Sequence, residues 1–327
     1  MPASLMPEAY AREEIYGGFF AAIGNFVRQG KTGSISRKDH TLLNEMRAKL
    51  GPDMKAMMQG ASVYSFKKGV STLSNALETY LRANPNVTID LGKPVEELVY
   101  DGKTQTIDIG PEPFDRVIST TSAAATSSII PSSSPINSLA RIPSVTVMVV
   151  NLYFSNPNLL PEQGFGYLIP RSIPFEQNPE CALGVVFDSD ALQGQDTVTG
   201  TKITVMLGGH WWDGLVAYPD SEEAVSMARA VLKRHLNVDE EPQAVNASLQ
   251  RDCIPQYTVG HKSRLKDAHY KLMSQFGGKL SVVGSSYTGV GLNDCIRAGR
   301  DLAKQIASEE NVTGLESFVQ PQQWVLV

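Results

Sequence analysis

The segment from Val283 to Cys295 constrains the fold of this 327-residue chain more than any other. It predicts the end of a β-strand, a loop with glycines at positions 284, 289 and 291, and the start of a helix. Glycines let a ligand approach the backbone closely, and the free N–H groups at a helix start attract negative charge. The pattern therefore indicates either an α/β ligand site or an α/β turn that binds nothing.

Two kinds of ligand suit such a loop: the phosphate of a dinucleotide, or the pyrimidine end of a flavin, where reduction builds negative charge. The dinucleotide fingerprint requires Gly-x-Gly-x-x-Gly, but Asp294 occupies the third glycine position after Gly289 and Gly291. Its carboxylate would repel a pyrophosphate. The residues of this loop thus favour the flavin over the pyrophosphate.

Composition narrows the class of protein. Apolar residues make up 42% of the chain and charged residues 19%, which is enough apolar surface for an ordinary packed core. The net charge of -5 and the absence of a basic run argue against nucleic acid as a partner. Three scattered cysteines and five scattered histidines show neither a disulfide framework nor metal-ligand spacing, so we expect no metal. No apolar stretch approaches the roughly 20 residues of a membrane-spanning helix.

Hydrophobic spacing predicts a mixed α/β chain that begins with helices. One apolar stripe near the start is typical of either a core-facing helix or a face that touches a membrane: Ile15, Phe19, Ile23 and Phe26 or Val27. A second helix holds Leu42–Leu50 and ends at Gly51–Pro52. From residue 61 we expect strands at Val63–Phe66, Val87–Leu91, Val95–Val99, Thr104–Ile109 and Phe114–Ser119, with one helix capped by Ser71. The small residues Thr120–Ser134 predict a loop with a turn of helix.

The middle of the chain predicts a β-rich region, and the end returns to βα order. Its expected strands are Val145–Phe154, Gly166–Ile169, Cys181–Asp188 and Lys202–Gly208, and they are interrupted by one helix capped by Ser221. A helix over about 262–275 and a strand at Leu280–Val283 then lead into the glycine loop. No internal repeat is visible.

Four segments, in order along the chain, resemble the protoporphyrinogen oxidase family within the flavin amine oxidases. They are Val63–Gly69 followed by Thr72–Leu73, Gly164–Pro170, Ile254–His261, and Val283–Arg300. Any one of them alone would be a weak signal, but four in order between residues 61 and 308 form a specific one. The resemblance implies FAD as cofactor, a tetrapyrrole as substrate and dioxygen as oxidant, with hydrogen peroxide formed in haem biosynthesis.

The same resemblance implies a domain plan. It comprises a helical region at 1–60, a portion of an FAD-binding Rossmann-like lobe at 61–140, an antiparallel-sheet substrate lobe at 141–260, and a closing FAD-lobe segment at 261–327. Flavoproteins of this type begin with a strand, Gly-x-Gly-x-x-Gly and a helix, and residues 1–60 contain no such motif. We therefore expect a truncated FAD lobe.

By resemblance, the cofactor-binding residues are Val95, Ser119, Thr120, Gly284, Gly289, Val290, Gly291, Leu292 and Asn293. The substrate-binding residues are Leu152, Gly166, Leu168, Gln256 and Tyr257. Each has a plainer interpretation beside it: Leu152 suits ordinary sheet core, and Pro255 makes the residue before it extended, as in a simple turn. The gain in aromaticity drives the reaction, so we expect no catalytic acid or base.

Localisation is also implied by resemblance alone: the mitochondrial inner membrane, on the intermembrane-space side, with peripheral attachment through the helical region. A homodimer is a further expectation. Two alternatives remain open from the sequence. One is another flavin amine oxidase or desaturase relative. The other is a non-enzymatic fragment that no longer binds FAD and exposes apolar surface where further strands would pack.

Overall fold

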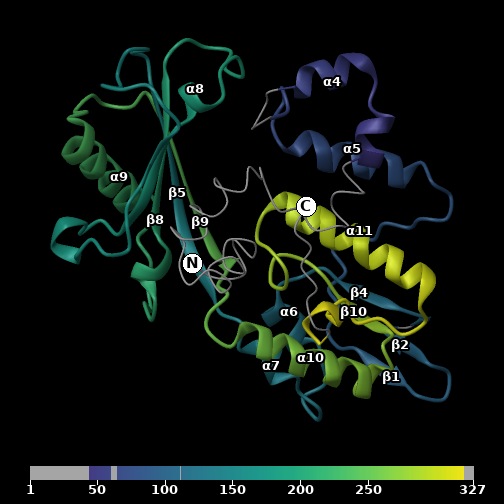
Figure 1. Ribbon diagram of the computed structural model, residues 1–327. Coiled ribbons are helices and arrows are strands. Elements are labelled where there is room, and N and C mark those ends of the chain that lie inside the picture. The colour runs from purple at the N-terminus through teal and green to yellow at the C-terminus, as the bar shows by residue number, and fades with distance from the viewer. Residues whose placement is uncertain (1–43, 60–64, 111, 320–327) are drawn as a thin grey trace, which may run out of the picture. The chain divides into compact units, whose positions relative to one another are not determined.

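The computed structural model describes residues 44–59, 65–110 and 112–319 (Figure 1). By its internal contacts the chain forms two compact units. Among the described residues, the first unit comprises 44–59, 93–110, 112–143 and 255–319, and the second comprises 65–92 and 144–254. The chain thus enters the second unit twice and returns to the first for its carboxy-terminal quarter.

The first unit contains two small sheets and several helices. A three-stranded antiparallel sheet has the order β1–β2–β3, and β4 pairs with β10 in parallel. The strands are β1 (Val99–Asp101), β2 (Thr106–Asp108), β3 (Pro113–Phe114), β4 (Val117–Ser119) and β10 (Leu280–Val282). The helices are α4 (Pro52–Met58), α6 (Ala123–Ser128), α7 (Asn137–Ala140), α10 (His261–Phe276), α11 (Leu292–Ser308) and the 3-10 turn η3 (Glu316–Phe318).

One apolar core holds the first unit together. It joins the three-stranded sheet through Ile107 and the segment before β1 through Leu98. It also includes Leu280 and Val282 of the parallel pair and Leu265 of α10. Arg116 closes the edge of this unit, because its guanidinium donates to the backbone carbonyls of Gly278, Val312 and Glu310. The parallel strands are therefore fixed against the segment that follows α11.

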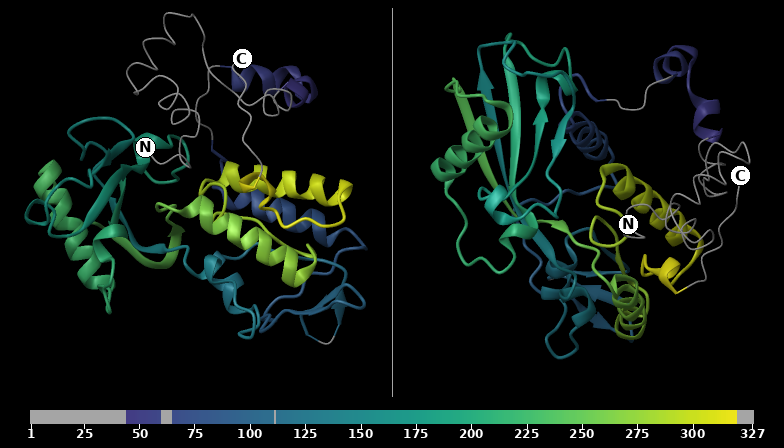
Figure 2. Two further views of the ribbon diagram at one scale, coloured as in Figure 1. Left: turned by 60° about the horizontal axis from the view of Figure 1, so that its bottom comes forward. Right: turned by 60° about the vertical axis from the view of Figure 1, so that its left-hand side comes forward.

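The second unit is built on a five-stranded antiparallel sheet with the order β6–β7–β8–β5–β9. Its strands are β5 (Ser144–Phe154), β6 (Gly166–Leu168), β7 (Ala182–Phe187), β8 (Thr201–Gly208) and β9 (Ala244–Pro255). The shorter elements are α5 (Ser71–Arg82), η1 (Phe175–Gln177), α8 (Asp188–Ala191) and η2 (Gly209–Trp212). Helix α9 (Ser221–Leu236) packs on one face of the sheet over β5 and β8 (Figures 1 and 2).

Helix α9 shows how local sequence sets these elements. Asp220 caps it in a full capping box with Glu223, and Asn237 ends it in the left-handed conformation. Its buried residues Ala224, Ala228, Val231 and Leu232 lie at helical spacing and fill the core beneath it. The sequence placed the cap at Ser221, but Ser221 is the first helical residue and Asp220 is the cap.

Most predicted elements of the middle and end of the chain are confirmed to within one or two residues, including β5, β7, β8, α10 and α11. Three predictions between residues 63 and 99 are wrong or lie outside the described residues. The strand predicted at Val87–Leu91 is irregular. The strand predicted at Val95–Val99 is irregular up to Leu98, after which β1 begins. Of the strand predicted at Val63–Phe66, Ser65 and Phe66 are irregular and Val63 is not described. Helix α5 begins at Ser71 itself, after Val70. Strand β9 was not predicted, because its alternation is masked by polar residues on both faces.

The predicted break at Gly51–Pro52 is confirmed: residues 44–49 are helical, and α4 starts anew with Pro52. The apolar stripe from Ile15 to Val27 lies outside the described residues. Within the described ranges, no helix combines the length and the apolarity that crossing a membrane requires. The fold class is confirmed as mixed helix and sheet, with a parallel α/β portion and an antiparallel sheet.

Candidate functional site

The carboxyl ends of β4 and β10 lie side by side and carry the predicted cofactor residues of the first unit. Ser119 pairs with Val282 in the parallel register, and the Val283 amide donates to the Ser119 carbonyl. Beyond this point the backbone of Gly284 adopts a φ of 135° and passes close to the Thr120 carbonyl. Ligands of α/β proteins bind at this edge of a parallel sheet. The structure thus brings together Ser119, Thr120 and Gly284.

A network of hydroxyl groups fixes the two strand ends beneath the loop. Ser119 Oγ lies 2.7 Å from Thr126 Oγ1 and 3.0 Å from Thr121 Oγ1, and Thr126 Oγ1 lies 3.5 Å from Tyr287 Oη. Ser286 Oγ accepts a bond from the Ala123 amide at 3.0 Å. Burial raises the pKa of Tyr287 to about 12, so its phenol is neutral near pH 7. The hydroxyl groups of Ser119, Thr126 and Tyr287 thus form an uncharged, hydrogen-bonded platform under the loop.

The end of the loop meets the start of α11. Gly291 is the N-cap, and no side chain of the described residues caps the helix. The side chain of Asp294 folds back over the loop: a Cβ built at Gly289 would lie 2.6 Å from its carboxyl carbon, and one at Gly291 3.1 Å from its Oδ2. Glycine at position 289 is thus required by the packing of Asp294, whereas a side chain at position 291 would need only a small movement of the Asp294 carboxylate.

Val290 and Leu292, which are 40% and 51% exposed, flank this helix start, and Asn293 is exposed beside them. Uncapped amides bordered by apolar side chains fit the pyrimidine end of a flavin, where donors face N1 and the C2 carbonyl. The Asp294 carboxylate makes the same end unsuited to a phosphate. The donor set therefore fits the flavin end of FAD and not its pyrophosphate.

Tyr257, which precedes α10, and His261, the first residue of α10, reach the same loop with their rings. The rings of Tyr257 and His261 stack at 4.2 Å with an interplanar angle of 18°. The Tyr257 hydroxyl donates to the Ser285 carbonyl, and His261 Nε2 lies 3.2 Å from the Tyr287 carbonyl. Burial raises the pKa of Tyr257, and nearby Cys295 and Asp294 act in the same direction. Tyr257 is therefore anchored to the loop.

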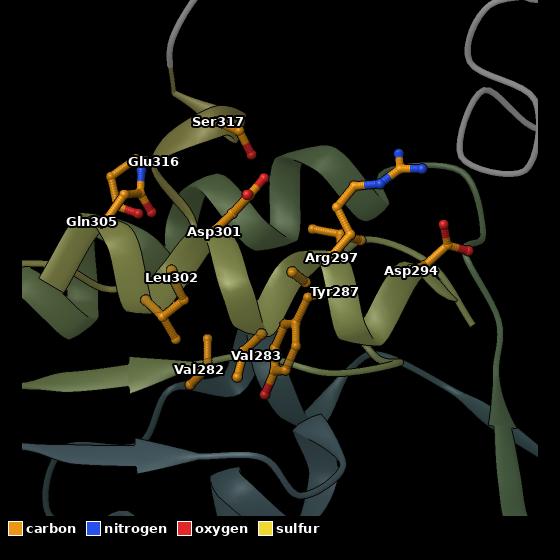
Figure 3. Close-up of a pocket in the computed structure, with 13 residues that line it drawn as sticks. Val282, Val283, Tyr287, Asp294, Arg297, Asp301, Leu302, Gln305, Glu316 and Ser317 are labelled. Atoms are coloured by element: carbon orange, nitrogen blue, oxygen red, sulfur yellow. The ribbon is translucent and has the colours of Figure 1, made fainter. Parts of the chain in front are cut away.

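A pocket of about 260 Å³ lies beside α11 (Figure 3). Figure 3 shows Leu302 pointing from α11 toward Val282, with Asp301 and Glu316 on the other side of the helix. None of the predicted site residues lines this pocket. Among the described residues no group of three or more His, Cys, Asp or Glu side chains can hold a metal ion.

The second unit carries two other predicted residues on the sheet face opposite α9. Pairing registers place Asn151, Thr204, Val186 and Gly166 in one row across β5, β8, β7 and β6. The neighbouring row consists of Val149, Met206, Gly184 and Leu168. We call these eight residues the open face, because Leu168 is 77% exposed and Asn151 is exposed as well.

A directional chain of hydrogen bonds runs along the polar row of the open face. Asn246 Nδ2 donates to Asn151 Oδ1 at 3.3 Å, Asn151 Nδ2 donates to Thr204 Oγ1 at 2.8 Å, and Thr204 Oγ1 donates to Asp188 Oδ2 at 2.6 Å. Burial is the main cause that raises the pKa of Asp188. The open face thus offers an apolar row beside a row of ordered polar groups.

Glycine at position 166 is required by the sheet. Its φ is 124°, and a Cβ there would overlap the Val185 carbonyl oxygen. Leu152, in contrast, is 1% exposed and belongs to the core between the sheet and α9. Leu152 therefore lies on the face away from Gly166 and Leu168, as its plainer interpretation suggested.

The remaining predicted residues lie in the first unit. Gln256 follows β9, and its backbone N–H donates to the Pro143 carbonyl at 2.8 Å. Val95 lies in the irregular segment before β1 and is 36% exposed. Sequence reasoning missed Thr126 and Tyr287, which organise the platform. Their contact with each other joins positions 161 residues apart, so no local pattern shows it.

Comparison with known proteins supplies the family context. The model of the family described as flavin containing amine oxidoreductase matches residues 26–307. Protoporphyrinogen oxidase of Schizosaccharomyces pombe is 34% identical over 261 residues, which cover 79% of this chain and 51% of that protein. Protoporphyrinogen oxidase of Homo sapiens is 35% identical over 266 residues, covering 78% and 54%. The chain thus spans about half the length of the curated relatives it matches.

Among solved structures, a protein from Exiguobacterium sp. 255-15 superimposes with a TM-score of 0.66 over 92% of this chain and 58% of that chain. Its sequence identity is 20%, so this likeness concerns the fold alone. The resemblance inferred from four sequence segments is confirmed by the named relatives.

Proposed function

The chain belongs to the family of flavin-containing amine oxidoreductases, and on that premise we propose that it oxidises protoporphyrinogen to protoporphyrin with FAD and dioxygen in haem biosynthesis. The observation that carries the proposal is the loop from Gly284 to Gly291 at the carboxyl ends of the parallel strands β4 and β10. Two relatives named protoporphyrinogen oxidase, each at least 34% identical, support the choice of substrate.

On the cofactor side, the amides at the start of α11 would hold the pyrimidine end of the flavin, and Val290 and Leu292 would offer apolar contact to it. Ser119 and Thr120 offer polar groups at the adjoining strand end, and Gly284 and Gly289 leave the backbone accessible. Bound FAD would supply the hydride acceptor for the substrate and the electron donor for dioxygen, which would leave as hydrogen peroxide in each of the repeated rounds. The helix amides favour the negative charge that flavin reduction creates.

On the substrate side, we assign the tetrapyrrole to the open face of the second unit. Leu168, Met206 and Val149 form an apolar row suited to a flat macrocycle, and binding of such a disc is driven by burial of apolar surface. Asn151 and Thr204, the polar side chains of the neighbouring row, offer hydrogen-bond acceptors and an amide N–H group to the pyrrole N–H groups and the rim of the macrocycle. Tyr257, which contacts the loop Gly284–Gly291, and Gln256 beside it in the chain are assigned to the substrate as well. Leu152, a core residue, has no part in this proposal.

The cellular setting is proposed from the relatives. We place the protein at the mitochondrial inner membrane, on the intermembrane-space side, attached peripherally and assembled as a homodimer. Eukaryotic relatives named protoporphyrinogen oxidase support a mitochondrial location. The apolar stripe from Ile15 to Val27 suits peripheral attachment by its sequence.

A second candidate function is a chain that binds no flavin by itself. One observation favours it: Ile118 on β4 and Leu292 and Ile296 on α11 are 45%, 51% and 50% exposed. Apolar groups exposed together mark surfaces that pack against other protein. The two candidates differ in a single measurable property, the presence of FAD in the purified protein.

The experiment is anaerobic protoporphyrinogen oxidation assayed by protoporphyrin fluorescence, with dioxygen then admitted and hydrogen peroxide measured. The proposal predicts porphyrin formation only when dioxygen is present, with FAD released on denaturation. Porphyrin formation with no flavin in the protein, or flavin with no oxidation of the porphyrinogen, would contradict it.

A further inference from the structure

We propose that Tyr257 and His261 form a brace that sets the conformation of the loop Gly284–Gly291, and that both are positioning residues for the cofactor. The inference rests on the proposed function for its meaning, but the brace itself is a property of the first unit. It assigns a role to His261, which the sequence analysis did not name as a site residue.

The brace is built by a tight turn before α10. Gly260 takes the left-handed conformation, with a φ of 86°, and the turn brings the Tyr257 ring back over His261. Arg264, one turn into the helix, holds the turn closed by donating to the carbonyls of Val259 at 3.2 Å and Thr258 at 3.3 Å. The stacked pair is thus fixed relative to α10 before it meets the loop.

The pair holds the loop at two carbonyls, two residues apart. Tyr257 Oη donates to the Ser285 carbonyl, and His261 Nε2 contacts the Tyr287 carbonyl at 3.2 Å. Those residues immediately precede Gly289–Gly291, and Tyr287 is only 2% exposed. Each bond removes a rotational freedom from a loop that its glycines would otherwise leave loose. The brace therefore fixes where the first amides of α11 stand.

The chemistry of the contact defines the tautomer of His261. A carbonyl only accepts hydrogen bonds, so Nε2 must carry the hydrogen. His261 Nδ1 is buried and has no hydrogen-bond partner among the described residues. A proton added there would have no acceptor among the described residues, and the Arg264 charge disfavours it. The neutral Nε2–H tautomer is the state in which the brace is complete.

The first test needs no variant: histidine ¹⁵N NMR of the purified protein identifies the tautomer. The brace predicts the Nε2–H form for His261 at neutral pH, and the Nδ1–H form would overturn it. Assignment uses loss of the signal in His261→Gln.

The second test measures amide hydrogen exchange over residues 283–295 in the protein prepared without FAD. His261→Phe keeps the stacked ring but removes the donor, so exchange should quicken by about tenfold, as expected for loss of one hydrogen bond. His261→Gln keeps an Nε2–H donor at the same reach and should restore most of the protection. Tyr257→Phe should act like His261→Phe.

The matched control is His269→Phe, on the same helix, because His269 Nδ1 contacts Thr313 Oγ1 and not the loop. It should leave exchange over residues 283–295 unchanged. Equal exchange in His261→Phe and the wild type, or equal quickening in His261→Gln and His261→Phe, would overturn the brace.

A third measurement links the brace to the cofactor. FAD binding and the visible flavin spectrum are compared between wild type and His261→Phe, with about tenfold weaker binding and an altered spectrum expected. Unchanged affinity and spectrum would overturn the positioning role. A wild type that binds no FAD would instead contradict the proposed function, and the exchange data would still decide whether the brace exists.

Discussion

The carboxylate of Asp294 lies over Gly289: a Cβ at residue 289 would stand 2.6 Å from the Asp294 Cβ, carboxyl carbon and Oδ2 alike. The relationship explains why a loop typical of ligand sites needs glycine here. Contacts within the chain, and not only a ligand, leave no room for a side chain.

Gly289→Ala should therefore destabilise the protein by about 1–3 kcal/mol, the usual range for overpacking. Urea unfolding measures the change. Gly299→Ala, on the helix α11 that follows the loop, is the control, because a Cβ there meets nothing within 4 Å. It should stabilise the protein by up to about 1 kcal/mol, since alanine is the better helix former.

The double variant Gly289→Ala with Asp294→Gly identifies the cause. Removing the Asp294 side chain relieves the clash, so the double variant should lose clearly less than the sum of the two single losses. Strict additivity would show that Gly289 is needed for another reason.

The stability of the first unit should depend on the protonation of His261. Burial is the main cause that lowers the pKa of His261 below 6.5, and the Arg264 charge acts in the same direction. Between that lowered pKa and 6.5 the unfolded chain binds more protons than the folded one, so stability rises with pH there. The stability that neutral His261 contributes is complete above pH 6.5 and is lost as the pH falls through the pKa of His261 in the folded protein.

The measurement is the difference in unfolding free energy between wild type and His261→Gln, from about pH 8 down to about pH 5. His210 and His235, whose pKa values burial also lowers, are present in both proteins and cancel. The advantage of the wild type should shrink on acidification. A difference that does not vary with pH would exclude His261 as the group responsible.

Leu152 and Leu168 were both expected at the substrate, and the structure separates them. Leu152→Ala should cost about 2–5 kcal/mol of stability, because Leu152 is 1% exposed in the core under α9. Leu168→Ala should change stability by less than about 0.5 kcal/mol, because Leu168 is 77% exposed. Under the proposed function it should raise the KM for the tetrapyrrole. An unchanged KM would remove the open face from the proposal.

Gly208 tests the packing at the end of β8. Its φ is 99°, and a Cβ there would overlap the Trp212 ring. Gly214 has a φ of 78° with open space around it. Gly214→Ala carries about 1–2 kcal/mol of backbone strain. Gly208→Ala should lose more, because its φ of 99° and ψ of -112° lie outside the left-handed helical region and because overpacking adds roughly 1–3 kcal/mol. Thermal unfolding compares them, and equal losses would contradict the role of Trp212.

The sequence predicted those elements whose pattern is local. Alternation located β5 and β8, and the strand, glycine loop and helix around Gly284–Gly291 appear as expected. The irregular stretches at Val87–Leu91 and Val95–Leu98 look like strands by composition but find no strand partner in the described part of the chain. Strand propensity alone does not supply that partner.

Parts of the candidate site depended on contacts that no local pattern encodes. The Thr126–Tyr287 contact and the bond from Tyr257 to the Ser285 carbonyl join residues that are 161 and 28 positions apart in the chain. Leu152 was assigned by resemblance, whereas its side of the sheet follows from the position of α9. Which residues are buried together is set by tertiary packing, and the sequence carries that information only indirectly.

Flavin content tests the central claim most directly. The purified protein is denatured, and released FAD is measured by fluorescence against the protein concentration. The account predicts FAD in a ratio near one per chain, held by the loop Gly284–Gly291 and the start of α11. Protein that is folded by circular dichroism, takes up no added FAD and releases none would contradict it.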